Sequence, residues 1–222
     1  MAVRWHACGD SFNATHNGGV VTMPRGWRFR WRWGACHRHA GARMARSVSK
    51  KRAKKIVLVG SPNVGKSVIF NNLTGTYATV SNYPGTTVEI FRGYTVINGQ
   101  PFEVVDTPGM YSMRPVTDEE RVTRRILLEE SPDVVLQIVD AKNLERALLL
   151  TLQLLEAGLR LILVLNMMDE AKRLGIEIDV EALSRMLQMP VVTTIGPRGI
   201  GMAQLREAIS RVTSDGAQSS DL

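Results

Sequence analysis

The sequence contains little cysteine and no long apolar run, and both deficits narrow the classes of protein that it encodes. Its 222 residues include two cysteines, Cys8 and Cys36, and both precede residue 56. Disulfides therefore cannot hold the rest of the chain together, which suits a reducing compartment. No segment approaches the roughly 18 consecutive apolar residues that a membrane-spanning helix needs. The length is sufficient for one sizeable core, so we expect one globular domain with extensions.

Charge is distributed unevenly along the chain. Residues 1–55 contain 13 lysines and arginines and a single acidic residue, Asp10, whereas residues 56–222 contain 15 basic and 20 acidic residues. All four tryptophans and all four histidines also lie in the basic segment. We therefore predict a basic, disordered N-terminal extension (1–54), a folded domain (55–213) and a disordered C-terminal tail (214–222).

The basic extension leaves several interpretations open. Its alternating segment 28–33 (Arg-Phe-Arg-Trp-Arg-Trp) is suited to nucleic acid or to an anionic lipid surface, although a charged run is commonly only solvated. Its His and Cys residues match no zinc-site spacing. The extension lacks the apolar core of about 7 to 15 residues that marks a secretory signal. A further interpretation is that translation starts at Met44, so that the preceding residues are not part of the protein.

The segment 60–67 is the most informative motif in the chain. It reads Gly-Ser-Pro-Asn-Val-Gly-Lys-Ser, follows the apolar run 56–59 and precedes a helical pattern at 68–73. A glycine-rich loop between a strand and a helix, ending in lysine and a hydroxyl, is typical of a phosphate-binding loop. A chance match in a glycine-rich loop is the alternative, which the flanking strand and helix disfavour. The residues expected to contact the nucleotide here are Gly60, Ser61, Pro62, Asn63, Val64, Gly65, Lys66 and Ser67, with Lys66 on the β- and γ-phosphates and Ser67 on Mg²⁺.

The remainder of the domain alternates between strand and helix patterns. Residues 74–88 carry no core periodicity and are expected to form a mobile surface loop, and Asn98-Gly99 predicts a hairpin between strands 88–97 and 102–105. The later elements are expected at 118–129 (helix), 134–139 (strand), 144–156 (helix), 161–165 (strand), 178–187 (helix), 191–195 (strand) and 202–212 (helix). This order predicts an α/β fold of the P-loop NTPase, Ras-like G-domain type, with a mainly parallel sheet, one antiparallel edge strand and helices on both faces.

A second motif, Asp106-Thr107-Pro108-Gly109, follows a predicted strand. An aspartate in this position holds Mg²⁺ in nucleoside triphosphatases, and the Gly109 amide is placed to sense the γ-phosphate. Taken alone, the motif could be an ordinary turn. The preceding loop, Gly85-Thr86-Thr87, supplies a hydroxyl from Thr87 that we expect on the same metal when the triphosphate is bound.

Base selection is predicted from Asn166-Met167-Met168-Asp169, which ends a buried strand. The Asp169 carboxylate can accept hydrogen bonds from both N1–H and the N2 amine of guanine, a donor pair that adenine lacks. The alternative is that Asp169 only caps a helix. We expect Asn166, Met167 and Asp169 to contact guanine, together with Gly196 or Arg198 on its O6 atom, because the intervening Pro197 has no N–H to donate.

Together with Asn143-Leu-Glu-Arg146 and the leucine-rich stretch after it, these motifs resemble the G domain of FeoB, the family of bacterial ferrous iron transport protein B, over about residues 55 to 212. The resemblance implies slow hydrolysis of GTP to GDP with Mg²⁺, and a K⁺ ion held by Asn63 in place of an arginine finger. The residues it implies for catalysis are Asn63, Lys66, Thr87 and Gly109. Met110 stands where Ras-like enzymes carry a water-orienting glutamine, and a thioether cannot orient water in that way.

The resemblance also implies where the chain acts. It places the protein in the cytoplasm, at the inner face of the cell membrane, beside a membrane-embedded iron transport partner, and we expect this chain to lack the helical regulatory and membrane domains of the family. Two other functions stay open. One is an RNA- or ribosome-associated GTPase that uses the basic extension, and the other is an interaction protein that binds nucleotide with negligible turnover.

Overall fold

The structure is a computed structural model that describes residues 53–75 and 78–215. The predictions for the basic extension, including its nucleic-acid, lipid and metal interpretations, fall outside the described residues, as does most of the predicted C-terminal tail. Within the described ranges, no helix combines the length and the apolar character needed to span a membrane.

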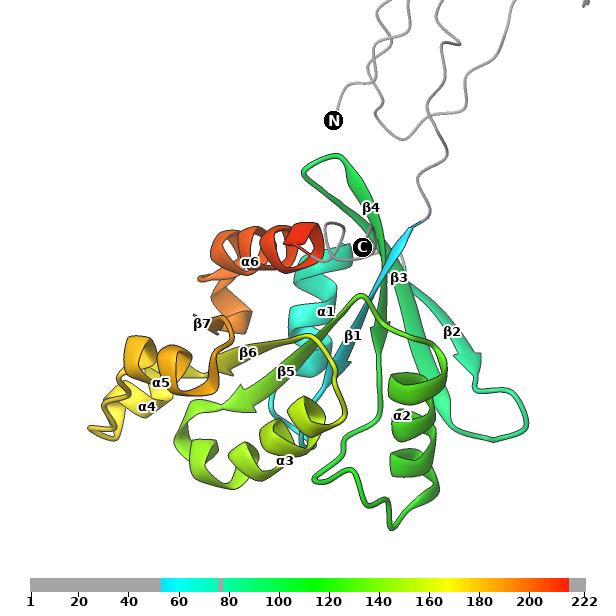
Figure 1. Cartoon of the computed structure of the whole chain (residues 1–222), viewed down its shortest axis with the longest axis horizontal. Coiled ribbons are helices and arrows are strands. Elements are labelled where there is room, and N and C mark those ends of the chain that lie inside the picture. The colour runs from blue at the N-terminus through cyan, green and yellow to red at the C-terminus, as the bar shows by residue number, and fades with distance from the viewer. Residues whose placement is uncertain (1–52, 76–77, 216–222) are drawn as a thin grey trace, which may run out of the picture. The chain divides into compact units, whose positions relative to one another are not determined.

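The domain is built on one seven-stranded sheet with the strand order β2-β3-β4-β1-β5-β6-β7 (Figure 1). Its strands are β1 (Lys54–Val59), β2 (Ala78–Asn82), β3 (Glu89–Ile97), β4 (Gln100–Asp106), β5 (Val134–Asp140), β6 (Leu161–Asn166) and β7 (Val191–Thr193). The pairs β4-β1, β1-β5, β5-β6 and β6-β7 are parallel, whereas β3 runs antiparallel to both of its neighbours. The predicted mainly parallel sheet with an antiparallel edge is confirmed.

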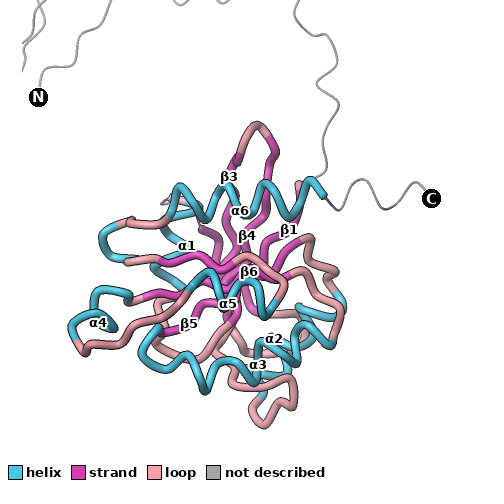
Figure 2. Tube along the Cα trace, turned by 60° about the vertical axis from the view of Figure 1, so that its left-hand side comes forward, coloured by secondary structure: helices cyan, strands magenta, loops and turns pink. Residues whose placement is uncertain are grey.

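Helices cover both faces of the sheet (Figures 1 and 2). They are α1 (Lys66–Thr74), α2 (Asp118–Glu129), α3 (Leu144–Glu156), α4 (Met168–Arg173), α5 (Val180–Leu187) and α6 (Met202–Asp215), with short 3₁₀ turns η1 (Ala141–Asn143) and η2 (Gly196–Arg198). One core cluster joins α1 and α6 to the sheet, and a second joins α2 and α3 to its other face. The predicted helix bounds 118–129 and 144–156 are confirmed.

Strand β1 illustrates why the central strands are apolar throughout. Ile56 and Leu58 belong to the cluster on the α1 and α6 side, whereas Val57 and Val59 belong to the cluster on the α2 and α3 side. All four are fully buried. Successive side chains of a strand point to opposite faces, so a strand covered on both sides needs a continuous apolar run.

Local sequence signals fix the hairpin and the start of α2. Asn98 and Gly99 have φ values of 50° and 75°, as a tight hairpin turn requires, and β3 pairs with β4 across them. At α2, the Thr117 side chain accepts a hydrogen bond from the Glu120 backbone N at 3.2 Å. Glu120 in turn accepts from the Val116 backbone N at 2.8 Å, which is a variant of the capping box.

The expectation that residues 74–88 form only a surface loop is wrong, because β2 (Ala78–Asn82) lies within them. All five residues of β2 are exposed, and the strand extends the antiparallel edge by pairing with β3. Since the strand is formed by backbone hydrogen bonds and buries no side chain, its sequence shows no apolar alternation. Smaller differences are that the predicted strand 191–195 ends at Thr193, the predicted helix 178–187 begins at Val180, and α4 was not predicted.

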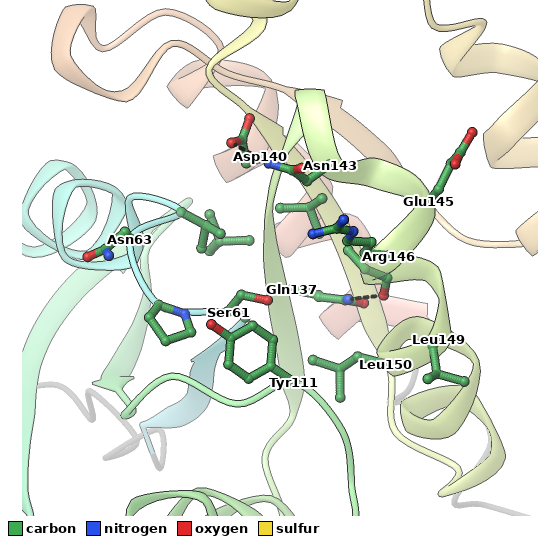
Figure 3. Close-up of a pocket in the computed structure, with 16 residues that line it drawn as sticks. Ser61, Asn63, Tyr111, Gln137, Asp140, Asn143, Glu145, Arg146, Leu149 and Leu150 are labelled. Atoms are coloured by element: carbon green, nitrogen blue, oxygen red, sulfur yellow. Dashed lines mark hydrogen bonds between the residues drawn. The ribbon is translucent and has the colours of Figure 1, made fainter.

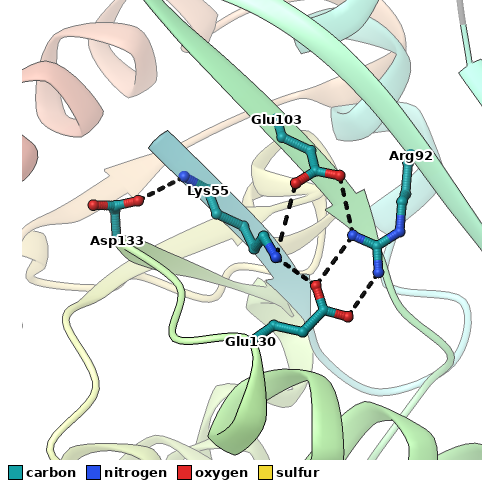
Figure 4. A network of polar contacts seen from close by, with 5 residues as sticks. All are labelled: Lys55, Arg92, Glu103, Glu130 and Asp133. Carbon is teal, nitrogen blue, oxygen red and sulfur yellow. Dashed lines mark hydrogen bonds and ion pairs between the residues drawn. The ribbon is translucent and has the colours of Figure 1, made fainter. Parts of the chain in front are cut away.

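A polar network closes the end of β1 that precedes its apolar run (Figure 4). Lys55 Nζ contacts Glu130 at 2.5 Å and Glu103 at 3.8 Å. Arg92 contacts the same two carboxylates at 2.7 and 3.1 Å, and the Lys55 backbone N donates to Asp133 at 2.7 Å. Although burial opposes it, the hydrogen bonds from Arg92 and Lys55 hold the pKa of Glu130 below its usual value.

Candidate nucleotide-binding site

The predicted phosphate-binding loop connects β1 to α1, as the sequence indicates. Gly60 has φ 150°, and a Cβ on it would lie 2.2 Å from the Ile138 carbonyl oxygen. Gly65 has φ 91°, and a Cβ there would lie 2.4 Å from Asn166 Nδ2. Both positions therefore require glycine, for conformation and for space.

Lys66 is buried and has no acidic partner among the described residues. Its Nζ donates to the carbonyl oxygens of Gly60 and Ser61, at 3.2 and 3.0 Å. Burial lowers the pKa of Lys66, and the nearby charge of Asp106 only partly offsets this effect. An ammonium group held by two neutral acceptors can exchange them for an anion, as phosphate binding requires.

Ser67 and Asp106, which the sequence proposes as Mg²⁺ ligands, lie in contact although they are 39 residues apart. Ser67 Oγ donates to Asp106 Oδ2 at 2.7 Å, while Asp106 Oδ1 is buried and has no hydrogen-bond partner. Burial raises the pKa of Asp106, against the hydrogen bond from Ser67 and the charge of Lys66. A buried, unpartnered carboxylate oxygen beside a hydroxyl fits Mg²⁺, which binds few protein oxygens and completes its shell with water and phosphate.

The segment 107–110 lies directly against the phosphate-binding loop. A Cβ on Gly109 would lie 2.7 Å from Pro62 Cγ, and the Met110 backbone N donates to the Gly60 carbonyl at 3.0 Å. Thr107 is anchored by its hydroxyl to the Leu58 carbonyl at 2.7 Å, and the Pro108 carbonyl accepts from Thr123 at 3.2 Å. The Met110 side chain is fully buried in the core cluster of α2 and α3, so it does not face the loop as a water-orienting group would.

The structure does not bring the threonine loop to this site. Thr87 is exposed and lines a separate cavity with Gly85 and Thr86, beside three arginines of α2: Arg121, Arg124 and Arg125. The Thr86 hydroxyl donates to the Tyr83 carbonyl at 2.9 Å. The described contacts therefore leave Thr87 apart from Ser67 and Asp106.

Asn166 connects the phosphate-binding loop to the loop after β7. It is 1% exposed, and its Nδ2 donates to the Val64 carbonyl at 3.0 Å. Its Oδ1 accepts from the Thr194 hydroxyl at 3.1 Å and from the Gly196 backbone N at 3.0 Å. Asn166 thus positions two loops through both ends of its amide group.

The predicted base-selecting residues lie beside Asn166. Met167 adopts a left-handed conformation, φ 60°, and is the N-cap of α4, so Asp169 lies in the first helical turn and does not cap it. Asp169 lines an open cavity of about 480 Å³ together with Lys172, Arg173 and Arg198. Of the two groups predicted for the O6 atom of guanine, the Gly196 N–H is bonded to Asn166, whereas Arg198 lines the same cavity as Asp169.

Asn63 occupies the exposed apex of the phosphate-binding loop, with φ 62°. Asparagine tolerates the left-handed conformation better than most residues do. Asn63 is among the residues that line the neighbouring cavity, and in Figure 3 it lies across that cavity from Arg146. Among residues 53–75 and 78–215, no group of three or more His, Cys, Asp or Glu side chains is placed to hold a metal.

Sequence reasoning missed one residue next to this site. Gln137 lies in β5 within an otherwise apolar run, is fully buried and keeps an unpartnered Oε1 atom. A polar residue that interrupts a buried strand was the available signal. Asn143 and Arg146, which the sequence offered only as family markers, line the same cavity as Gln137.

This fold, with a phosphate-binding loop between β1 and α1 and an aspartate that closes β4, defines a P-loop nucleotide-binding domain of the G-domain class. Residues 54–209 match the family model described as "Ferrous iron transport protein B". The chain therefore belongs to the FeoB family, through its N-terminal G domain.

Solved structures and curated relatives agree with this assignment. The G domain of the T. maritima FeoB iron transporter is 38% identical with a TM-score of 0.68, and the match covers 72% of this chain and 99% of that one. The FeoB G domain of Methanococcus jannaschii is 44% identical with a TM-score of 0.65, over 73% and 99% of the two chains. An Fe(2+) transport protein A/FeoB fusion protein of Porphyromonas gingivalis is 44% identical over 70% of this chain. The match covers 18% of that fusion protein.

Proposed function

We propose that this chain binds GTP with Mg²⁺ and hydrolyses it slowly to GDP, as the nucleotide-responsive module of ferrous iron uptake. The observation that carries the proposal is the unsatisfied pair at the start of α1: Lys66 lacks an acidic partner, and Asp106 keeps a buried oxygen without a donor. Native proteins rarely leave such groups unpaired away from a functional site.

Each residue of the loop has a role in this proposal. Backbone N–H groups from Gly60 to Ser67 and the N-terminus of α1 hold the phosphates, and Lys66 contacts the β- and γ-phosphates. Ser67 and Asp106 hold Mg²⁺, which when bound neutralises charge on the phosphates. Gly109 senses the γ-phosphate through its backbone N–H, and Thr87 reaches the metal only after its loop leaves the cavity beside α2.

Slow turnover and a dependence on K⁺ complete the proposal. The buried Met110 cannot orient water, so this position offers no replacement for the glutamine of Ras-like enzymes. We assign Asn63 to a K⁺ ion beside the phosphates, where a cation offsets charge that develops in the transition state. The exposure of Asn63 at the apex of the loop supports this assignment.

Iron uptake enters the proposal through the relatives, which are named as Fe(2+) transporters. Since the chain spans about a quarter or less of the curated relatives' length, transport itself requires parts that the match does not include. We place the module at the cytosolic face of a membrane-embedded transport partner, because solved relatives are described as cytosolic domains of FeoB.

A base-selection titration tests the nucleotide assignment. Calorimetry with GTP, ATP and XTP is expected to show at least about 100-fold preference for GTP over ATP, because a buried polar group without its partner is costly. Asp169→Asn is expected to prefer XTP, since an amide can donate to the xanthine carbonyl. Asp118→Asn, which changes another aspartate in the first turn of a helix, is the matched control and should keep the preference for GTP. Equal binding of ATP and GTP would contradict the proposal.

A further inference from the structure

A cavity of about 680 Å³ lies on the α3 side of the phosphate-binding loop, and residues 60–64 of that loop contribute to its lining. Figure 3 shows Tyr111 near Ser61 of the loop, Arg146 and Leu150 on α3, and Gln137 between the two sides. Lys66, Ser67 and Asp106 do not line this cavity. Its volume lies within the range of small-molecule sites, which is about 300–1,000 Å³.

Gln137 gives this cavity a specific chemical feature. The side chain is 0% exposed, and its Nε2 donates to the Ala147 carbonyl of α3 at 3.0 Å. Its Oε1 atom is buried and has no hydrogen-bond partner among the residues that the structure describes. An unpartnered acceptor in a protein core is destabilising unless a donor reaches it, so this position is suited to a ligand that carries an N–H or O–H group.

The rest of the lining restricts the ligand further. Pro62, Val64 and Leu150 provide apolar walls, and the Tyr111 ring offers an aromatic surface. Among the lining residues, Glu145 and Arg146 carry opposite charges, and Asp140 is paired with Lys142 at 3.6 Å, so the lining favours no net charge on the ligand. Tyr111 is 64% exposed, so burial in the core does not fix its ring.

We propose that this cavity binds a neutral, aromatic-sized group whose single N–H donates to Gln137 Oε1. The chemistry is that of an indole ring, which combines an apolar body with one donor and no acceptor. The ring could be a free small molecule or a tryptophan side chain of a protein partner. The proposal is independent of the proposed function, because occupation of the cavity needs no nucleotide.

The test is an NMR titration of the ¹⁵N-labelled full chain without nucleotide. Indole is expected to bind with a Kd of about 1 mM, as its few heavy atoms allow, and to shift the Gln137 side-chain amide signals. Those signals are assigned by their loss in Gln137→Leu. The matched probe, 1-methylindole, has the same ring without the donor and should bind about fivefold to tenfold more weakly. A blocked Gly-Trp-Gly peptide, titrated separately, distinguishes a partner's tryptophan from a free molecule. If the peptide and indole both bind, the site accepts a partner's side chain. If indole binds and the peptide does not, the site takes a free molecule.

Variants separate the specific contact from general apolar binding. Gln137→Leu should bind indole and 1-methylindole equally, and it should fold, because the Ala147 carbonyl still accepts from the Thr151 hydroxyl at 3.1 Å. Tyr111→Ala should weaken indole several-fold without any core change, whereas Tyr94→Ala, a tyrosine of matching 65% exposure outside the cavity, should not. The proposal is wrong if indole leaves the cavity residues unshifted, or if the wild-type chain binds both rings equally.

Discussion

Lys55, near the start of β1, and Lys66, at the start of α1 beyond the other end of β1, have contrasting surroundings. Lys55 lies in a network where each charged group meets an opposite charge or a backbone donor (Figure 4). Lys66, at the other end, contacts only backbone carbonyls, and the neighbouring Asp106 retains a buried oxygen without a donor. Polar groups that stabilise the fold are thus paired within it, whereas those at the phosphate-binding loop are left for a ligand.

The same contrast appears in the acidic groups. The pKa of Glu130 is lowered by its hydrogen bonds from Arg92 and Lys55, which outweigh burial. The pKa of Asp106 is raised because burial outweighs its contacts with Ser67 and Lys66. Ionisation of Glu130 therefore favours folding, whereas ionisation of Asp106 opposes it.

The largest expected effect comes from replacing each of the two lysines with alanine in a separate variant. Lys66→Ala should weaken GTP binding about 100-fold, since charge-assisted hydrogen bonds to phosphate are lost, while the free energy of unfolding without nucleotide changes by less than about 0.5 kcal/mol. Lys55→Ala should show the reverse: a loss of about 1–2 kcal/mol of stability with GTP affinity unchanged. Calorimetry and urea unfolding measure both quantities. If Lys66→Ala binds GTP as tightly as the wild type, the contrast between Lys66 and Lys55 does not reflect a role of Lys66 in nucleotide binding.

The second prediction concerns K⁺ and Asn63, at the apex of the phosphate-binding loop. GTP turnover is expected to be about tenfold faster in K⁺ than in Na⁺ buffer, and Asn63→Ala should abolish that ratio. Asn98→Ala is the matched control, because Asn98 has a similar φ of 50° in the β3-β4 turn and lies outside the site. Phosphate release measured in both salts decides the question, and equal turnover in the wild type would contradict the role of K⁺.

Asp106→Asn should stabilise the nucleotide-free protein by about 1 kcal/mol at pH 7, because it removes a buried charge. A carboxyl group with a raised pKa contributes stability below its unfolded value, about 3.9, and loses it as pH rises through the folded value. The advantage of the variant should therefore shrink as pH falls from 7 towards 4.

The control for this variant is Asp133→Ala, which should destabilise, because it removes the acceptor of the hydrogen bond from the Lys55 backbone N. Urea unfolding at the two pH values measures each difference. GTP affinity of Asp106→Asn should also lose its dependence on Mg²⁺. A destabilised Asp106→Asn at pH 7 would show that the buried charge is already compensated.

The smallest expected effect is at Glu130. Glu130→Gln should lose about 0.5–1 kcal/mol of stability at neutral pH, with nucleotide affinity unchanged. A glutamate with a lowered pKa contributes stability above its unfolded value, about 4.3, and this contribution disappears as pH falls through the folded value. Wild type and variant should therefore converge in urea unfolding as the pH falls below the unfolded value. A constant difference across pH would mean that packing, and not charge, is what the variant disturbs.

The sequence predicted those parts of the molecule that depend on local pattern. The Asn98-Gly99 turn, the helix 118–129 and the loop 60–67 each carry their own signal within a few residues. Strand β2 could not be predicted, because it pairs through its backbone and buries nothing. Residue chemistry likewise identified Lys66 and Asp106, but not the orientation of the groups around them.

Long-range contacts explain the remaining differences at the site. Thr87 is predicted to reach the metal only when the triphosphate is bound, and in this structure it lines a cavity with residues of α2, a placement that depends on the packing of distant segments. The unpaired oxygen of Gln137 depends on where α3 places the Ala147 carbonyl. The sequence shows that a polar residue interrupts β5, but it cannot show which of its atoms remains without a partner.

The amide of Asn166 has a practical consequence for redesign. Because Asn166 is hydrogen-bonded to the main chain of the phosphate-binding loop and of the loop after β7, a substitution of Asn166 would disturb both loops together. Asp169 lies in the first turn of α4 and does not join these two loops in the described part of the chain, so its side chain can be changed without disturbing them. A chain redirected at that one position to an unnatural nucleotide would provide an orthogonal switch, which could be turned on in a cell without affecting other GTP-dependent proteins.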